Sequence, residues 1–339
     1  MTYSYRAYGL SCLSDAPVSG FLPESISSRK SEILVELCPS APLWVRKARA
    51  LAPSPMHAKI GELQAVGSSC TITAYGAEEY FGLAYSDGTQ FVIDGEARRV
   101  WGACPLPLTM EDLAVYLRGP VMGFVLRRRG VMALHASSVA IEGRAVVLCG
   151  PSEAGKSTSA AALALRGVPV LSDDVTALSE GGAGFQVEPG YPRICLWPDA
   201  VRDLLGQPDA LPKLTPSWEK CFLPLDGNNA RFEEHRKSLG AVYLLAPRTA
   251  EANAPRIEEL GTREALLELV QNTYMNWLLD RNQRAAEFDA LSKLVTQVPV
   301  RRIVPHADPR RIGELCDLIL ADAKCLSADC DSTSLISKR

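Results

Sequence analysis

The stretch with the clearest chemical potential is a glycine-rich loop at residues 150–157. Gly150, Gly155, Lys156 and Ser157 satisfy the pattern G-x-x-x-x-G-K-[ST]. The glycines let successive backbone N–H groups turn inward toward a phosphate, and the following helix adds the positive end of its dipole. The lysine then reaches the β- and γ-phosphates, and the serine hydroxyl ligates Mg²⁺. The predicted nucleotide-binding residues are Gly150, Pro151, Ser152, Glu153, Ala154, Gly155, Lys156, Ser157 and Thr158.

The segments around this loop favour the same interpretation. A short, wholly apolar strand, "AVVLC", precedes it, and residues 156–166 are rich in the helix formers Ala and Leu. "VPVLS" at 168–172 reads as a second buried strand, which completes a βαβ unit. The alternative is a strand-to-helix turn with an incidental lysine. One departure is Glu153, where many such loops have glycine, because a carboxylate beside triphosphate lowers affinity unless it points outward.

Two adjacent acids, Asp173 and Asp174, follow the second strand. Open α/β sheets build their sites at the carboxyl ends of strands, so we expect these acids to face the phosphate loop. On extended backbone adjacent side chains diverge, which predicts one carboxylate directed to a metal and the other to a different neighbour. The alternative is an Asp pair that only begins a turn.

The segment "LHASSVAIEGRAVVLCGPSEAGKSTSAAALALRGVPVLSDDVTAL" (134–178) resembles the core of the HPr serine kinase superfamily. It is most similar to bacterial HPr-kinase-related proteins, including kinases of lasso-peptide biosynthesis clusters. A weaker resemblance extends over "YRAYGL", "GYPRICLWPDA" and "RRIVPHADPRRIGEL". The resemblance implies an α/β fold, with a P-loop kinase domain of the HPr kinase/PEP carboxykinase-like type that uses ATP and Mg²⁺.

The same resemblance implies roles for individual residues. Asp173 would be the base that takes the proton of an acceptor serine, Asp174 would help Ser157 to hold Mg²⁺, and Lys156 would act on the transferred phosphate. His135, fifteen residues before the first loop glycine, would sit beside the catalytic aspartate and tune it.

The chain departs from the family's pattern in one segment. It lacks the Glu-Ile-Arg-Gly signature that contributes to dephosphorylation and HPr docking in HPr kinases proper. "GYPRICLWPDA" occupies the comparable region, which leaves Arg193 as a candidate phosphate-binding cation and Lys220 as a second one. Either residue is otherwise an ordinary surface charge.

These features predict an ATP- and Mg²⁺-dependent kinase that phosphorylates a serine hydroxyl of a peptide or small protein. The most specific version is the C-terminal serine of a lasso-peptide precursor. A kinase of a small hydroxylated metabolite would use the same site, so that alternative stays open. A nucleotide-binding sensor without transfer activity is the other alternative, and Glu153 is its only hint.

The elements that must position these residues suggest two domains and a tail. Residues 1–108 show short alternating runs with hairpin signals at Asp87-Gly88 and Asp94-Gly95, which predict a small β-rich domain. Residues 109–325 are the predicted kinase domain, and the polar segment 326–339 is expected to be disordered.

Within the predicted kinase domain, several elements can be placed from local signals. Thr109 offers a helix cap, followed by a helix to about residue 129 that bends near Pro120. Residues 209–230 read as loop and 262–293 as helix. Further strands are expected at 136–149, as a hairpin through Glu142-Gly143, and at 241–246 and 298–304, and a final helix is expected to end near 323.

Composition narrows the class of partner. The 339 residues carry a net charge of −3, so electrostatics give no case for nucleic acid. The start lacks a basic-then-apolar layout, and no run approaches the ~18 apolar residues of a membrane span, which predicts a cytoplasmic protein without membrane contact. The ten cysteines show no C-x-x-C spacing, which argues against a zinc ribbon. A homo-oligomer is compatible with the sequence.

Overall fold

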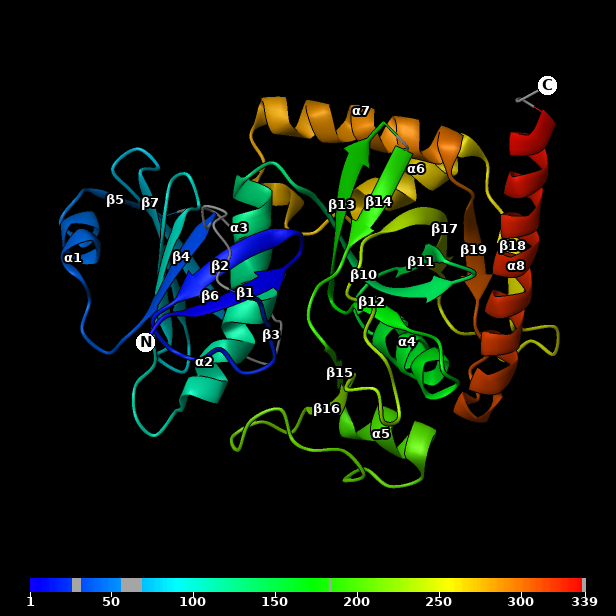
Figure 1. The fold of residues 1–339 in the computed structure, drawn as a ribbon, viewed down its shortest axis with the longest axis horizontal. Coiled ribbons are helices and arrows are strands. Elements are labelled where there is room, and N and C mark those ends of the chain that lie inside the picture. The colour runs from blue at the N-terminus through cyan, green and yellow to red at the C-terminus, as the bar shows by residue number, and fades with distance from the viewer. Residues whose placement is uncertain (26–31, 56–68, 183, 337–339) are drawn as a thin grey trace. The chain divides into compact units, whose positions relative to one another are not determined.

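The computed structural model describes residues 1–25, 32–55, 69–182 and 184–336, and its two compact units are considered one at a time (Figure 1). Unit 1 comprises Met1–Val131 with Leu214–Trp218 and Met275–Asp280, and unit 2 comprises the rest. The predicted mixed α/β class is confirmed. The division differs from the predicted boundary at residue 108, because the helical segment after that point belongs to unit 1.

Unit 1 is built on one sheet, in which the described residues form nine strands in the order β3-β1-β2-β4-β9-β8-β7-β6-β5. The pairs β2–β4 and β4–β9 are parallel and the others are antiparallel. Alternating burial along these strands gives the sheet the core-facing side that the period-two pattern predicts. The elements outside the helical segment are β1 (Tyr3–Ala7), β2 (Leu10–Ser14), β3 (Leu22–Pro23), β4 (Ile33–Leu37), α1 (Leu43–Arg49), β5 (Pro53–Pro55), β6 (Cys70–Tyr75), β7 (Tyr80–Tyr85), β8 (Gln90–Asp94) and β9 (Arg99–Ala103).

The helical segment of unit 1 runs through α2 (Met110–Tyr116), a π-helical turn η2 (Leu117–Val121) and α3 (Met122–Arg128). Thr109 is the N-cap, as the sequence predicted, and it also forms a capping box with Asp112. Pro120 lies in the π-helical turn, since proline has no N–H to donate to the regular ladder. Phe124 packs edge-on against Phe81 of the sheet at 5.3 Å, which ties this segment to unit 1.

Unit 2 is built on strands in the order β11-β10-β13-β14-β17-β19-β18, with β12 paired to β10 and β11 also paired to β17. The strands β11, β17 and β19 are mutually parallel, so their carboxyl ends meet at one edge. The pairing of β12 and β11 with opposite sides of β10 confirms the predicted βαβ order, with β10 between the two parallel strands. The strands are β10 (Met132–Ile141), β11 (Arg144–Cys149), β12 (Val170–Ser172), β13 (Val175–Gly181), β14 (Gly184–Glu188), β17 (Lys237–Leu245), β18 (Arg256–Glu259) and β19 (Val300–Val304).

Helices cover both faces of this sheet (Figure 1). Along β11, Val146 and Leu148 join the core beneath α4 (Lys156–Leu165), α5 (Pro198–Leu205) and α8 (Ile312–Ile336). Ala145, Val147 and Cys149 alternate into the core beneath α6 (Thr262–Gln271) and α7 (Arg281–Gln297). Burial on both faces explains why this strand is apolar from Ala145 to Cys149. Because both faces of β11 are packed, the orientation of the strand at Cys149, where the phosphate loop begins, is fixed.

Two expectations about the segments 262–293 and 209–230 were wrong in part. The single helix predicted over 262–293 is broken into α6 and α7, because the intervening Tyr274 N–H donates to Ala133 of β10 (2.8 Å); the short 3₁₀ helix η3 (Asn276–Leu278) follows. The loop predicted at 209–230 contains β16 (Cys221–Pro224), which pairs with β15 (Arg193–Leu196).

The C-terminal helix also extends beyond its predicted end. After the 3₁₀ turn η4 (Pro309–Arg311), α8 continues to Ile336 through most of the segment expected to be disordered. No glycine or proline interrupts the sequence from 314 to 336, so the helical ladder has no local signal to stop. Residues 337–339 lie outside the described residues.

Candidate functional site

The predicted strand–loop–helix arrangement is confirmed around residues 150–156. β11 ends at Cys149 and α4 begins at Lys156, with Gly155 as its N-cap at φ +98°. This positive φ favours glycine, and a Cβ there would lie 2.9 Å from Nη2 of Arg248, which places the end of that side chain over the loop. The first turn of α4 is thereby open toward the loop, which is the geometry that binds anions.

The Lys156 side chain is enclosed by this loop. Its ammonium donates to the carbonyl oxygens of Gly150 (2.9 Å) and Pro151 (2.8 Å), and the residue is buried. Burial lowers the pKa of Lys156, whereas the negative charges of Asp174 and Asp173 act in the opposite direction. The loop therefore holds a poorly hydrated cation close to both acids, where a phosphate would be strongly attracted.

Asp173 is fully enclosed, with 1% of its surface exposed. Its Oδ1 accepts a hydrogen bond from the Ser137 hydroxyl (2.7 Å), and its Oδ2 accepts one from the Cys195 backbone N–H (3.0 Å). Burial raises the pKa of Asp173, and the hydrogen bonds from Ser137, Cys195 and Ser157 oppose that rise. Both oxygens are thus committed, and one neighbour is the serine of the phosphate loop.

Asp174 has a different environment. Its side chain is 33% exposed, and its Oδ1 lies 3.3 Å from Nε2 of His135. Burial acts to raise the pKa of Asp174, but His135, Lys220 and Lys156 together lower it. This carboxylate is therefore held ionised, beside an imidazole and in contact with solvent.

His135 lies beside Asp174, whereas the family resemblance implies a place beside Asp173, the acid that it gives as the base. His135 contacts Asp174 and not Asp173, which instead contacts Ser137, two residues further along β10. The two carboxylates do diverge, as predicted, but the backbone is not extended: Asp174 has φ +67°. A left-handed residue turns its side chain away from the direction that a strand would give it.

The two candidate cations lie at the two-stranded sheet of β15 and β16, where Arg193 begins β15 and Lys220 directly precedes β16. The Arg193 guanidinium lies 4.1 Å from the centre of the Phe222 ring, and the Lys220 ammonium lies 5.1 Å from that of Trp197. Lys220 is the one whose charge acts on both Asp174 and Lys156. Lys220 is therefore a cation whose charge helps to lower the pKa of Asp174.

Sequence reasoning missed three residues that belong to this site. Ser137 could have been found from β-strand periodicity, because it shares a face with His135. Cys195 acts through its backbone N–H, which leaves no signal in residue type. Arg248 follows β17, whose carboxyl end lies beside that of β11, and its guanidinium lies over Gly155 of the loop.

The arrangement fits a magnesium–nucleotide complex. Ser157, Asp173 and Asp174 offer the oxygen ligands that Mg²⁺ prefers, and Mg²⁺ usually binds through one or two carboxylates plus substrate phosphates. Within the described ranges, no group of three or more His, Cys, Asp or Glu side chains forms a metal site by itself. The residues therefore suit a metal ion that arrives with phosphate rather than one caged by protein.

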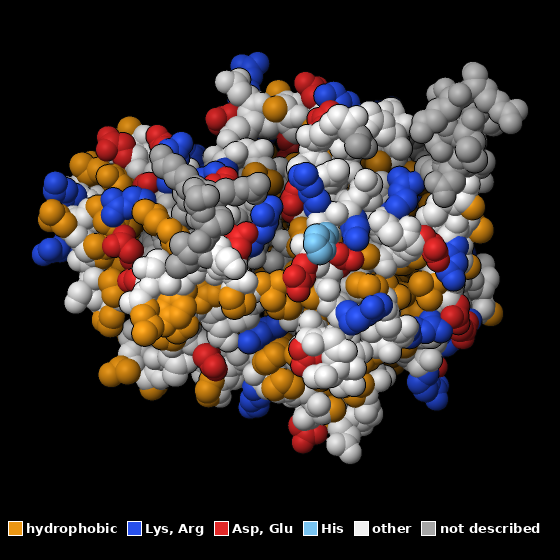
Figure 2. Space-filling model, viewed as in Figure 1, with side chains coloured by type: hydrophobic (Ala, Val, Ile, Leu, Met, Phe, Trp, Pro, Cys, Tyr) orange, Lys and Arg blue, Asp and Glu red, His pale blue; other side chains and the backbone are white. Residues whose placement is uncertain are grey.

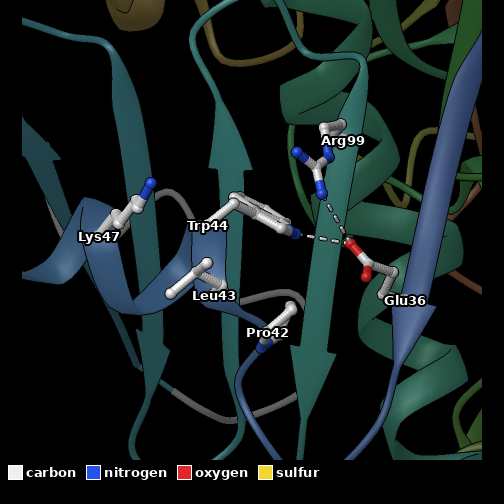
Figure 3. A pocket seen from close by; sticks show the side chains of 6 residues that line it. All are labelled: Glu36, Pro42, Leu43, Trp44, Lys47 and Arg99. Atoms are coloured by element: carbon white, nitrogen blue, oxygen red, sulfur yellow. Dashed lines mark hydrogen bonds and ion pairs between the residues drawn. The ribbon is translucent and has the colours of Figure 1, made fainter.

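A pocket of about 360 Å³ lies elsewhere, in unit 1, between β4, β9 and the start of α1 (Figure 3). Its Glu36 carboxylate accepts hydrogen bonds from Trp44 Nε1 (2.6 Å) and Arg99 Nη2 (3.4 Å), and Arg99 also stacks over the Trp44 ring. These polar groups satisfy one another, and none of the predicted site residues lines the pocket. We assign it no ligand.

The charges and helices set limits on other kinds of site. On the face shown in Figure 2, basic and acidic side chains are interspersed rather than gathered by sign, in keeping with the net charge of −3. Over the part of the chain that the structure describes, no helix is long and apolar enough to cross a membrane.

Comparison with known proteins gives a distant structural likeness. No protein-family model matches the chain, and no curated protein matches it. Among solved structures 43 chains match, including the HPr(Ser) kinase/phosphatase from Coxiella burnetii. That match is 14% identical, covers 60% of this chain and 95% of the other, and has a TM-score of 0.33. A likeness at this level adds nothing to the assignment of the site, which rests on the residues and their geometry.

Proposed function

We propose that this protein is an ATP- and Mg²⁺-dependent phosphotransferase that moves the γ-phosphoryl group of ATP to a hydroxyl group. The observation that carries the proposal is the pair of acids beside the enclosed ammonium of Lys156. One acid is buried and linked to the loop serine, and the other is partly exposed and paired with His135. A site that only held nucleotide would need the loop but not a second, solvent-facing carboxylate.

The environments of the two acids suggest roles opposite to those that the resemblance implied. Asp173, with Ser157, would supply the oxygen ligands of Mg²⁺, since its oxygens are fixed and inaccessible to a large acceptor. Magnesium bound there would neutralise charge on the phosphates. Asp174 would act as the base, because its carboxylate is reachable from solvent, whereas that of Asp173 is enclosed.

In the proposed transfer, the acceptor oxygen forms a bond to the γ-phosphorus while the bond from that phosphorus to the bridging oxygen of ADP breaks. The acceptor proton passes to the Asp174 carboxylate, and His135 holds that carboxylate in position. Lys156 keeps the phosphate chain in place. General-base assistance of this kind contributes roughly 10²- to 10⁴-fold to the rate.

For the acceptor, we propose a serine hydroxyl of a peptide or small protein, with the C-terminal serine of a lasso-peptide precursor as the most specific version. This part of the proposal is supported by the sequence resemblance alone. A small hydroxylated metabolite would be served by the same groups.

The test is a transfer assay with purified protein, ATP, Mg²⁺ and pools of serine peptides and hydroxylated metabolites, read by mass spectrometry. Asp174→Asn should lower the turnover number by roughly 10²- to 10⁴-fold and leave the affinity for a fluorescent ATP analogue almost unchanged. Asp209→Asn, at an exposed acid outside the site, is the matched control and should behave as the natural chain. Full turnover by Asp174→Asn, or no phosphate transfer by the natural chain, would refute the proposal.

A further inference from the structure

The end of β10 that carries His135 is paired along both of its edges. β13 pairs with it along one edge. Along the other edge lies the segment 272–274, which directly follows α6 and forms an antiparallel bridge with β10. The His135 N–H donates to the carbonyl oxygen of Asn272 (2.9 Å), and the Tyr274 N–H donates to that of Ala133 (2.8 Å). The backbone of His135 is therefore fixed from both sides of its strand.

The aromatic ring of Tyr274 also contacts the imidazole of His135. The two ring centres lie 6.1 Å apart with an angle of 80° between their planes, which is an edge-on arrangement. Aromatic pairs favour this geometry. Tyr274 is buried, whereas the His135 side chain is 31% exposed and its Nε2 lies 3.3 Å from Oδ1 of Asp174. The imidazole therefore has the carboxylate at one nitrogen and a buried ring beside it, and this ring limits the angles to which the imidazole can turn.

Ion pairs and hydrogen bonds hold the end of α6 from which the segment 272–274 extends. Glu264 and Glu268 both pair with Arg302 of β19, the first at 2.6 Å. The carbonyl oxygen of Glu268 accepts hydrogen bonds from the backbone N–H (3.2 Å) and the side-chain amide (2.8 Å) of Asn272. A residue that orients another must itself be held by its surroundings. Tyr274 meets this condition, because α6 is tied to β19 and the segment after α6 is tied to β10.

We propose that Tyr274 is a positioning residue for phosphate transfer: its ring orients the His135 imidazole so that Nε2 stays against the Asp174 carboxylate. Tyr274 acts through His135 and takes no part in the reaction steps. A base that is held in its reactive geometry takes up the acceptor's proton more often than one that can turn away. The inference rests on the proposed function, in which Asp174 is that base.

The first experiment measures the turnover number of variants on the acceptor found in the transfer assay. Tyr274→Phe keeps the ring and should retain the natural turnover number within about twofold, whereas Tyr274→Leu removes the ring and should lower it by roughly three- to tenfold. Affinity for the fluorescent ATP analogue should stay within about twofold in both variants, because the change acts on His135 and not on the phosphate loop. Phe288→Leu, at an aromatic residue of α7 that is 49% exposed, is the matched control and should behave as the natural chain.

A double-mutant cycle separates action through His135 from a general loss of packing. In a chain that already carries His135→Ala, Tyr274→Leu should cost no further activity, because the imidazole that the ring orients is gone. A second readout needs neither activity nor a variant: nuclear Overhauser cross-peaks between the ring protons of Tyr274 and His135 should appear in spectra of the natural chain. His135→Ala identifies these peaks among those of the four histidines.

Four results would overturn the role of Tyr274 alone: full turnover by Tyr274→Leu, equal losses in Tyr274→Phe and Tyr274→Leu, a further loss from Tyr274→Leu in the His135→Ala background, or no cross-peaks in the natural chain. Should Tyr274→Leu fail to fold, Tyr274→Phe and the cross-peaks still decide the matter. If the natural chain transfers no phosphate to any acceptor, the proposed function fails and the positioning role falls with it.

Discussion

Replacement of Glu153 tests whether the phosphate loop carries both a strained residue and an unfavourable charge. Glu153 is exposed and has φ +66°, a conformation that costs an L-residue ~1–2 kcal/mol. Glu153→Gly removes that cost but gives the unfolded chain ~0.4–1 kcal/mol of extra conformational freedom. The net expectation is a gain of ~0.5–1 kcal/mol in the free energy of unfolding. For a unit of this size that corresponds to a rise of ~1–4 °C in Tm.

The charge of Glu153 contributes separately. Two unit charges ~8 Å apart in a water-like medium repel by ~0.5 kcal/mol, and physiological salt screens them over a similar length. With several charges on ATP, removal of the carboxylate should tighten ATP binding by roughly two- to fivefold. Glu153→Gln removes the charge but keeps the left-handed backbone, whereas Glu153→Gly changes both.

The assay combines calorimetric unfolding with titration of a fluorescent ATP analogue at low and high salt. Both variants should bind ATP more tightly, with the gain shrinking in high salt, but only Glu153→Gly should raise Tm. A lower Tm for Glu153→Gly would refute the strain argument. Unchanged affinity in Glu153→Gln at low salt would show that the carboxylate does not face the phosphates.

Two further predictions concern the loop's surroundings. Arg248→Gln should weaken binding of the ATP analogue by roughly tenfold, because the guanidinium lies over Gly155 and a hydrogen bond to phosphate is charge-assisted; equal affinity in the variant and the natural chain would exclude Arg248 from the nucleotide site. For Asp173, burial raises the folded-state pKa, so below about pH 3.9 the carboxyl is protonated in both states and costs nothing. As pH rises the unfolded chain ionises first, so the natural chain should lose stability relative to Asp173→Asn until the raised pKa is passed. Urea unfolding of both proteins at a series of pH values checks this, and parallel stability curves would contradict it.

The parts of the site that local sequence determines could be predicted. The phosphate loop, its flanking strand and helix, and the acids after the next strand were all placed correctly, because glycine pattern, apolar runs and helix propensity act over short distances. The helix cap at Thr109 could be predicted for the same reason, and the helix is irregular at Pro120, where a bend was expected.

The partners of the acids depend on contacts between distant segments, which no local signal encodes. His135 meets Asp174 because β10 pairs with β13 in one register, with His135 opposite Val175, and because Asp174 adopts a left-handed conformation. The break between α6 and α7 has the same origin, since Tyr274 bonds to β10 instead of to its own helix. The helical segment after residue 108 belongs to unit 1 because Phe124 packs against Phe81 of the sheet. The helical pattern of the sequence does not encode that contact.

One strand, β10, carries the partners of both acids, with His135 and Ser137 side by side on a single face. A slip of β10 by one residue would put Leu134 or Ala136 in the place of His135, and Ala136 or Ser138 in the place of Ser137. In either direction an apolar side chain replaces the imidazole, so a chain that has paired this strand wrongly loses the His135–Asp174 contact. The correct pairing of β10 and the His135–Asp174 contact therefore form together, and loss of this contact would indicate that the strand has paired wrongly.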